Sequence, residues 1–123
     1  MPGVLEPLIA KGLRSVILFG VIKPEEKDKH GSKSIDDDGP VIKSIQLLKE
    51  KFPDLFVICD VCLCPYTDHG HCGLICSESG EIKNEKSVQA ISQVAFRYAC
   101  AGADCVAPSD CMDGRIGVIK KRF

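Results

Sequence analysis

Three short apolar runs alternate with helical patterns along this chain. The runs cover residues 15–20, 56–61 and 103–108. Each run is apolar almost throughout, whereas a strand with one face in water alternates apolar and polar side chains. Strands that alternate with helices form parallel sheets, because a crossover helix returns the chain to the start of the next strand. The pattern therefore predicts an α/β fold with parallel strands.

The predicted helices are amphipathic. Residues 40–52 begin with a proline, which the first helical turn tolerates, and stop before a second proline. Apolar side chains recur at helical spacing at Val41, Ile45 and Leu48. Similar helical segments cover residues 5–11, 85–101 and 114–122. The predicted order of elements is α-β-α-β-α-β-α.

Residues 23–39 form a long loop between the first strand and the helix that follows. The loop contains four lysines and six acidic residues and few apolar side chains. This composition is typical of a solvated, mobile segment, and long loops in compact domains also serve as lids over functional sites. No Gly/Ser linker or internal repeat divides the sequence. Residues 1–123 are therefore predicted to form a single domain.

The charge balance limits the kinds of partner. The formal net charge is −1, from 16 basic and 17 acidic residues, which provides no basic surface for nucleic acid or an anionic membrane. No apolar stretch approaches the roughly 20 residues of a membrane span, and the first residues do not resemble a secretory signal. We therefore expect a cytoplasmic location and a small-molecule partner, with no nucleic acid and no membrane.

Three cysteines follow the second apolar run within eleven residues: Cys62, Cys64 and Cys72. Side chains two apart in an extended chain point the same way, so the first two can face one point. The loop over residues 65–71 can return the third to the same place. Three thiolates favour zinc over hard cations, and a site with three protein ligands leaves one coordination position open.

Other metal sites are compatible with the same cysteines. A closed structural zinc site would recruit His69 or His71 as the fourth ligand. An iron–sulfur cluster would need Cys59 or Cys76 as a fourth thiolate, and the usual C-x₂-C-x₂-C run is absent. The sequence favours the three-cysteine zinc site and leaves the closed site as its main alternative.

Disulfide and redox roles fit these cysteines poorly. Cys62 and Cys64 are separated by one residue, and a cytoplasmic chain keeps its thiols reduced. The pair Cys59-x-x-Cys62 straddles a strand end, whereas a thioredoxin-like motif begins a helix. The two-residue period of the strand turns Cys59 away from Asp60 and into the core. We also interpret three other cysteines as packing or incidental thiols: Cys76, Cys100 and Cys105.

Polar residues mark the ends of the second and third predicted strands. Ligands of parallel sheets gather at the carboxyl ends of the strands. Asp60 lies within an apolar strand, where an unpaired carboxylate is costly, so it should contact a partner or a substrate. Ser109 follows the third strand and also fits a turn or a helix N-cap, with Asp110 and Asp113 starting the next helix.

Two long motifs resemble a known family. Residues 59–73 read CDVCLCPYTDHGHCG and residues 107–115 read APSDCMDGR. Both resemble the porphobilinogen synthase family, also called 5-aminolevulinate dehydratase, and the likeness extends to residues 11–20 and 49–53. The resemblance implies a (β/α)₈ TIM barrel. It also implies a lyase that condenses two 5-aminolevulinate molecules to porphobilinogen in tetrapyrrole (heme) biosynthesis.

The resemblance also assigns residues. In the zinc-dependent branch of the family three cysteines of the first motif hold the metal, which implies Zn²⁺ on Cys62, Cys64 and Cys72. It places Asp60 and Ser109 beside the substrate as supporting catalytic residues. It also implies that the nearby His71 lies close to the metal.

The chain departs from the family pattern in length. A TIM barrel typically needs about 250 residues, whereas this chain offers about three βα units and matches the front half of the family. The resemblance therefore implies a fragment, a partial TIM barrel. The resemblance also implies that this fragment is without the N-terminal arm through which family members form homo-octamers. Asp68 and Cys111 stand where the family usually has serine and methionine, and neither is a proposed zinc ligand.

The family's catalytic lysines are also missing. Two lysines on later strands form Schiff bases with substrate in the family, and none of the 12 lysines here lies in a matching motif. The chain alone is therefore expected to be inactive. The alternative function is a non-catalytic zinc-binding or assembly module.

Overall fold

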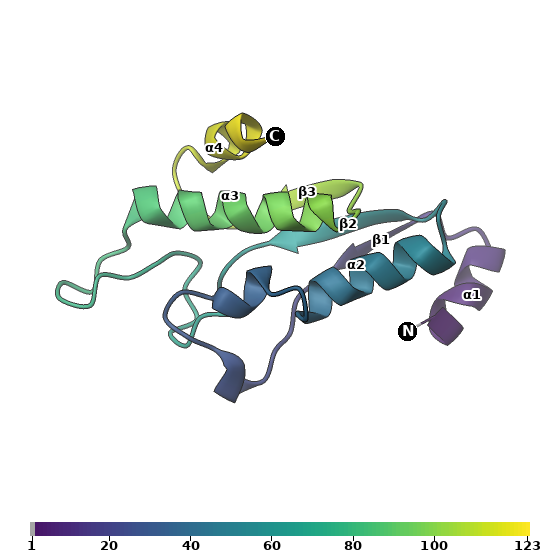
Figure 1. Cartoon of the computed structure of the whole chain (residues 1–123), viewed down its shortest axis with the longest axis horizontal. Helices are drawn as coiled ribbons and strands as arrows, with labels where there is room; N and C mark the ends of the chain where they lie inside the picture. The colour runs from purple at the N-terminus through teal and green to yellow at the C-terminus, as the bar shows by residue number, and fades with distance from the viewer. Residues whose placement is uncertain (1) are drawn as a thin grey trace.

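Three parallel strands form one sheet in the computed structural model, which describes residues 2–123 (Figure 1). The elements in chain order are α1 (Pro2–Ala10), β1 (Ser15–Leu18), the 3₁₀ turns η1 (Pro24–Glu26) and η2 (Ser32–Ile35), α2 (Pro40–Lys51), β2 (Phe56–Val61), α3 (Asn84–Cys100), β3 (Cys105–Pro108) and α4 (Arg115–Arg122). The predicted α/β order is confirmed. Within the described residues, no helix is both long enough and apolar enough to cross a bilayer.

The strands pair in sequence order. Ser15 of β1 lies opposite Phe56 of β2, and Ile58 of β2 lies opposite Cys105 of β3. Both pairings are parallel, as the apolar runs predicted. The helices α2 and α3 provide the two crossovers, and Figure 1 shows both running alongside the sheet. The chain thus contains two complete βαβ units that share the central strand.

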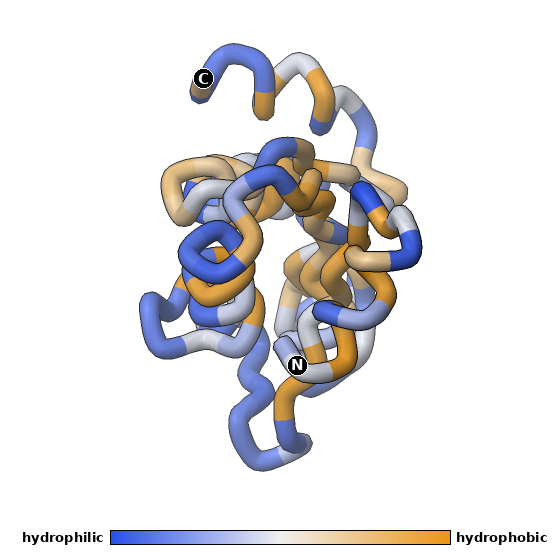
Figure 2. The backbone as a smooth tube through the Cα atoms, turned by 90° about the vertical axis from the view of Figure 1, so that its right-hand side faces the viewer, coloured by the Kyte–Doolittle hydropathy of each residue, from blue (hydrophilic) through white to orange (hydrophobic). Residues whose placement is uncertain are grey.

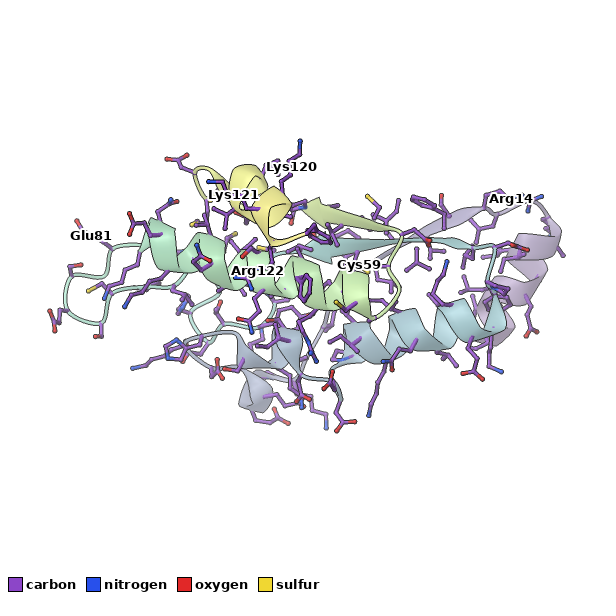
Figure 3. All side chains as sticks on the ribbon, turned by 45° about the horizontal axis from the view of Figure 1, so that its top comes forward. Arg14, Cys59, Glu81, Lys120, Lys121 and Arg122 are labelled. Atoms are coloured by element: carbon purple, nitrogen blue, oxygen red, sulfur yellow. The ribbon has the colours of Figure 1, made fainter. Side chains whose placement is uncertain are left out.

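The core lies between the sheet and the helices α2 and α3. Burial alternates along β2, and Val57, Cys59 and Val61 are fully buried. Their side chains belong to one apolar cluster with residues of both helices. Cys59 lies in the interior of the molecule (Figure 3), and burial raises the pKa of its thiol to about 12. The prediction that Cys59 is a core residue is confirmed.

The opposite face of the sheet is open. Ile17 and Phe56, which face away from the helices, are 48% and 47% exposed, and Phe19 just after β1 is 63% exposed. Fully apolar strands predicted burial on both faces, and that expectation is met on one face only. The physical reason is that α2 and α3 cover the same face, and nothing within residues 2–123 forms a second layer.

The loop over residues 23–39 is packed more closely than its composition predicted. Most of its residues are hydrophilic (Figure 2), yet Gly31 and Ser34 are buried. Gly31 has a φ of 65°, and a Cβ there would lie 3.3 Å from side-chain atoms of Leu63 and Tyr66. Glycine therefore permits both the left-handed turn and the close approach. Most other residues of this loop are exposed or half-buried, so the loop packs against the rest of the chain only locally.

One carboxylate ties the start of β3 to its neighbours. The Oδ2 atom of Asp104 accepts hydrogen bonds from the Val57 amide at 2.8 Å and from Lys49 Nζ at 2.9 Å. The Val57 hydrogen bond, followed by the contact with Lys49, holds the pKa of the Asp104 carboxyl below its usual value. This carboxylate therefore stabilises the strand pairing in its charged form.

We predict that Asp104→Asn lowers the free energy of unfolding by about 1 kcal/mol at pH 7, since hydrogen bonds to an exposed charged group contribute modestly. A depressed carboxyl pKa adds stability above the unfolded pKa of about 3.9 and loses it as the pH falls through the folded pKa. The difference should therefore shrink toward about pH 3. Urea denaturation at both pH values measures it. The exposed Asp54→Asn is the matched control, and equal stability of native and variant at pH 7 would contradict the prediction.

Candidate metal centre

Three thiols converge just beyond the end of β2. The Sγ atoms of Cys62, Cys64 and Cys72 all lie within 4.8 Å of one another, and the first two are 3.2 Å apart. All three are free cysteines, as the separation requires, because a disulfide bond is about 2.05 Å long. Tetrahedral zinc with Zn–S bonds of about 2.3 Å holds its sulfurs about 3.8 Å apart. The predicted convergence of these cysteines is confirmed, and the donor set fits a soft cation.

The position of the cluster follows from the direction of the strands. Arg14 precedes β1 and Glu81 lies in the loop before α3, and the two lie at opposite ends of the molecule (Figure 3). The parallel strands begin at the Arg14 end, so the cluster lies at the carboxyl ends of the strands, which we call the carboxyl edge of the sheet. There the carbonyl of Leu63 accepts hydrogen bonds from the amides of Tyr66 and Thr67 at 2.9 and 3.0 Å. This tight turn reverses the chain and returns Cys72.

Two of the three thiols, those of Cys64 and Cys72, favour their protonated form when no cation is bound. Burial, followed by the nearby Cys62, raises the pKa of Cys64 to about 11 and that of Cys72 to about 12. Three sulfurs this close cannot carry three negative charges without a compensating positive charge. A divalent cation would displace the protons and supply that charge.

Neither His69 nor His71 lies where it could serve as a fourth ligand. Within residues 2–123, the group of converging ligand atoms contains the three cysteines and no histidine. His71 is exposed, and its backbone amide donates to Nδ1 of His69 at 3.1 Å. The geometry therefore favours the three-ligand site over the closed alternative. Cys59 and Cys76 also lie outside the converging group, so the four-thiolate alternative finds no support.

Asp60 lies two residues before the first ligand cysteine. Its side chain is half-buried on the open face of the sheet, and it pairs in register with Ala107 of β3. Burial is the main cause of the raised pKa of Cys64, and the Asp60 charge makes a small further contribution. No hydrogen bond or ion pair joins its carboxylate to another residue among residues 2–123. The expected partner is therefore not supplied by the described residues, and contact with a substrate remains a prediction.

Ser109 begins the loop after β3. Its side chain is exposed, and its amide donates to the Val61 carbonyl at 3.2 Å. The helix N-cap interpretation is wrong, because α4 begins at Arg115 and Gly114 is its N-cap residue. The β2–β3 hydrogen bond instead brings Ser109 to the same edge of the sheet as the thiols.

A buried ion pair in this loop was not expected from the sequence. The Asp110 side chain is fully buried, with Oδ1 3.2 Å from Nε of Arg115, at an angle that does not make a hydrogen bond. Its Oδ2 accepts from the Met112 amide at 2.9 Å. Burial raises the pKa of the Asp110 carboxyl despite these contacts. The sequence indicated this pair only through the spacing of five residues between Asp110 and Arg115. Asp110 was instead assigned to the start of the following helix, so the pairing was not predicted.

Cys76, expected to be a packing or incidental thiol, has a distinctive environment. It is half-exposed in the loop before α3, and hydrogen bonds from the backbone amides of Ser79 and Glu78 lower its pKa to about 6. Cys100 and Cys105 are exposed, which agrees with incidental rather than packing thiols. Residues 76–80 form a turn in which the Gly80 amide donates to the Cys76 carbonyl at 2.9 Å. In the sequence, Gly80 was the one local sign of this turn.

Comparison with known proteins identifies the family. The family model described as "Delta-aminolevulinic acid dehydratase" matches residues 2–123. The delta-aminolevulinic acid dehydratase of Eremothecium gossypii is 55% identical over 121 residues, which are 98% of this chain and 35% of the relative. The enzyme of the same name from Schizosaccharomyces pombe is 57% identical over 119 residues, which are 97% of this chain and 36% of the relative.

A solved structure agrees with these relatives. The crystal structure of delta-aminolevulinic acid dehydratase (porphobilinogen synthase) from Toxoplasma gondii ME49, in complex with the reaction product porphobilinogen, matches with a TM-score of 0.91 and 36% identity. The match covers 98% of this chain and 35% of that chain. This chain thus spans about a third of the length of its relatives, and its three strands form part of a TIM barrel. The chain belongs to the delta-aminolevulinic acid dehydratase family.

Proposed function

We propose that this chain carries the metal-binding part of a porphobilinogen synthase, the enzyme that condenses two 5-aminolevulinate molecules to porphobilinogen in heme biosynthesis. The observation that carries the proposal is the convergence of three thiols at the carboxyl edge of the sheet, with Asp60 two residues before the first. Family membership and the porphobilinogen bound to the Toxoplasma gondii relative support the same substrate.

The metal in this proposal is zinc, held by Cys62, Cys64 and Cys72. Thiolate ligands select zinc among the common divalent ions, and three ligands leave one position free for a substrate group. When bound, zinc acts as a Lewis acid toward a substrate carbonyl or binds a substrate amino group. His71 precedes the third ligand and is proposed to lie near the metal without binding it.

The remaining proposed site residues face the substrate. Asp60 lies on the open face of β2, where its carboxylate would orient a substrate amino group and transfer protons at its oxygens. The hydroxyl of Ser109 would hydrogen-bond the substrate from the end of β3. A cytoplasmic location also belongs to this proposal, and assembly into the family homo-octamer is proposed for the whole enzyme only.

We predict that the native chain binds about one zinc ion and that the triple variant Cys62→Ser, Cys64→Ser, Cys72→Ser binds none, because serine hydroxyls replace the soft thiolates. Metal analysis after dialysis measures the stoichiometry. A matched triple variant changes three exposed cysteines to serine: Cys100, Cys105 and Cys111. That control should keep its zinc. Full zinc content in the first variant would reject the ligand assignment.

Asp60→Asn should lower kcat about a hundredfold when this chain is followed by the remainder of the family barrel, since a general acid–base group typically contributes this much. The melting temperature should stay near the native value, because the side chain lies on the open face. Asp54→Asn, two residues before the start of the same strand, is the control. A large drop in melting temperature with normal turnover would make Asp60 a structural residue.

A second function is metal binding or assembly without catalysis. The exposed apolar side chains of Ile17, Phe19 and Phe56 favour it, because a contiguous apolar surface is typical of an interaction site. In this function the chain would bind zinc and pair with longer subunits of the family.

Borohydride trapping with labelled 5-aminolevulinate tests whether this chain alone can act as a catalyst. We predict no covalent adduct and no porphobilinogen from the 123-residue chain alone, because no lysine lies in a family Schiff-base motif. Metal and acid–base assistance cannot replace the covalent anchor that distinguishes two identical substrates. Peptide mapping identifies any adduct. A stoichiometric adduct on a lysine of this chain, together with product, would show that the chain is itself a catalyst.

A further inference from the structure

The loop between the second and third ligand cysteines is organised around Thr67. This side chain is fully buried. Its amide donates to the carbonyl of Leu63, the residue that separates the first two ligands, at 3.0 Å. Its hydroxyl donates to the carbonyl of His71, the residue before the third ligand, also at 3.0 Å. One residue therefore connects the two parts of the ligand set through two hydrogen bonds.

The backbone of this threonine is fixed from the other side by the loop over residues 23–39. The Asp28 amide donates to the Tyr66 carbonyl at 3.3 Å, and the Asp28 carbonyl accepts from the Asp68 amide at 3.0 Å. The carboxylate of Asp28 accepts from the amides of His30 and Ser32 at 2.8 and 3.1 Å, which holds the turn in shape. We call residues 23–39 the strap and residues 65–71, between the second and third ligand cysteines, the ligand loop. Through Asp28 the strap thus holds the backbone of the ligand loop on both sides of Thr67.

The two halves of the Thr67 side chain have different roles. The methyl group faces the strap, because a Cβ on Gly31 would lie 3.6 Å from Thr67 Cγ2. The hydroxyl faces the backbone next to Cys72. Loss of the methyl group should weaken packing between loop and strap. Loss of the hydroxyl should release the third ligand from the first two.

We propose that Thr67 is a positioning residue of the metal centre, whose hydroxyl holds Cys72 within reach of Cys62 and Cys64. The inference rests on the proposed zinc site and concerns a residue that does not touch the metal. Groups that orient metal ligands in this way contribute about 10- to 100-fold to metal affinity.

The experiment compares Thr67→Val with Thr67→Ser in the 123-residue chain. Valine keeps the methyl packing and lacks the donor, whereas serine keeps the donor and lacks the methyl. Competition with a chromophoric chelator gives the Kd for zinc, and thermal unfolding of the metal-free chains gives Tm. We expect valine to raise the zinc Kd about tenfold with a small change in Tm. Serine should keep the native Kd and lower the Tm.

Two further variants complete the design. Thr67→Ala lacks both groups, so it should match the valine variant in Kd and the serine variant in Tm. Ser92→Ala removes a fully buried hydroxyl that donates to the Gln89 carbonyl at 2.8 Å within α3. This control should lower the Tm and leave the zinc Kd unchanged, because Ser92 lies outside the ligand loop.

The outcomes separate this inference from the zinc proposal. A valine variant with the native Kd, or a serine variant that weakens zinc as much as valine does, would overturn the role of the Thr67 hydroxyl while the zinc site stands. A native chain that binds no zinc would overturn the metal centre and this inference with it.

Discussion

The packing of one row of β2 side chains against two helices underlies the whole arrangement. Val57, Cys59 and Val61 lie in the apolar cluster with α2 and α3, and this contact fixes which face of the strand is core. Because side chains alternate along a strand, Asp60 must then lie on the other face. A shift of one residue in register would place that carboxylate in the core and remove it from the open face of the sheet.

Much of the fold could be predicted because its signals are local. The prolines before and after α2 and the apolar spacing within it gave both helix ends, and the strand over residues 56–61 needed only its apolar run. The open face could not be predicted in this way. Ile17 and Phe56 have the composition of buried residues, and composition does not show whether a covering layer is present.

In the candidate site, too, the features set by local geometry were predictable and those set by loop folding were not. The spacing of Cys62, Cys64 and Cys72 indicated their convergence, because alternation and a short return loop are local geometry. The burial of Asp110 against Arg115 and the turn around Cys76 were not foreseen. Both depend on how loops fold back on themselves, for which side-chain periodicity carries no signal. Ser109 was placed at the correct edge, although the helix that it was expected to start begins further along.

The strap from Asp28 across the ligand loop has a consequence for transplanting this motif. Residues 62–72 contain every thiol of the centre, but the bridge between Asp28 and Thr67 is supplied by a distant part of the chain. A graft of the short cysteine segment into another scaffold would carry the donor atoms and leave behind the backbone that sets their spacing. The smallest portable unit of this centre is therefore a pair of segments.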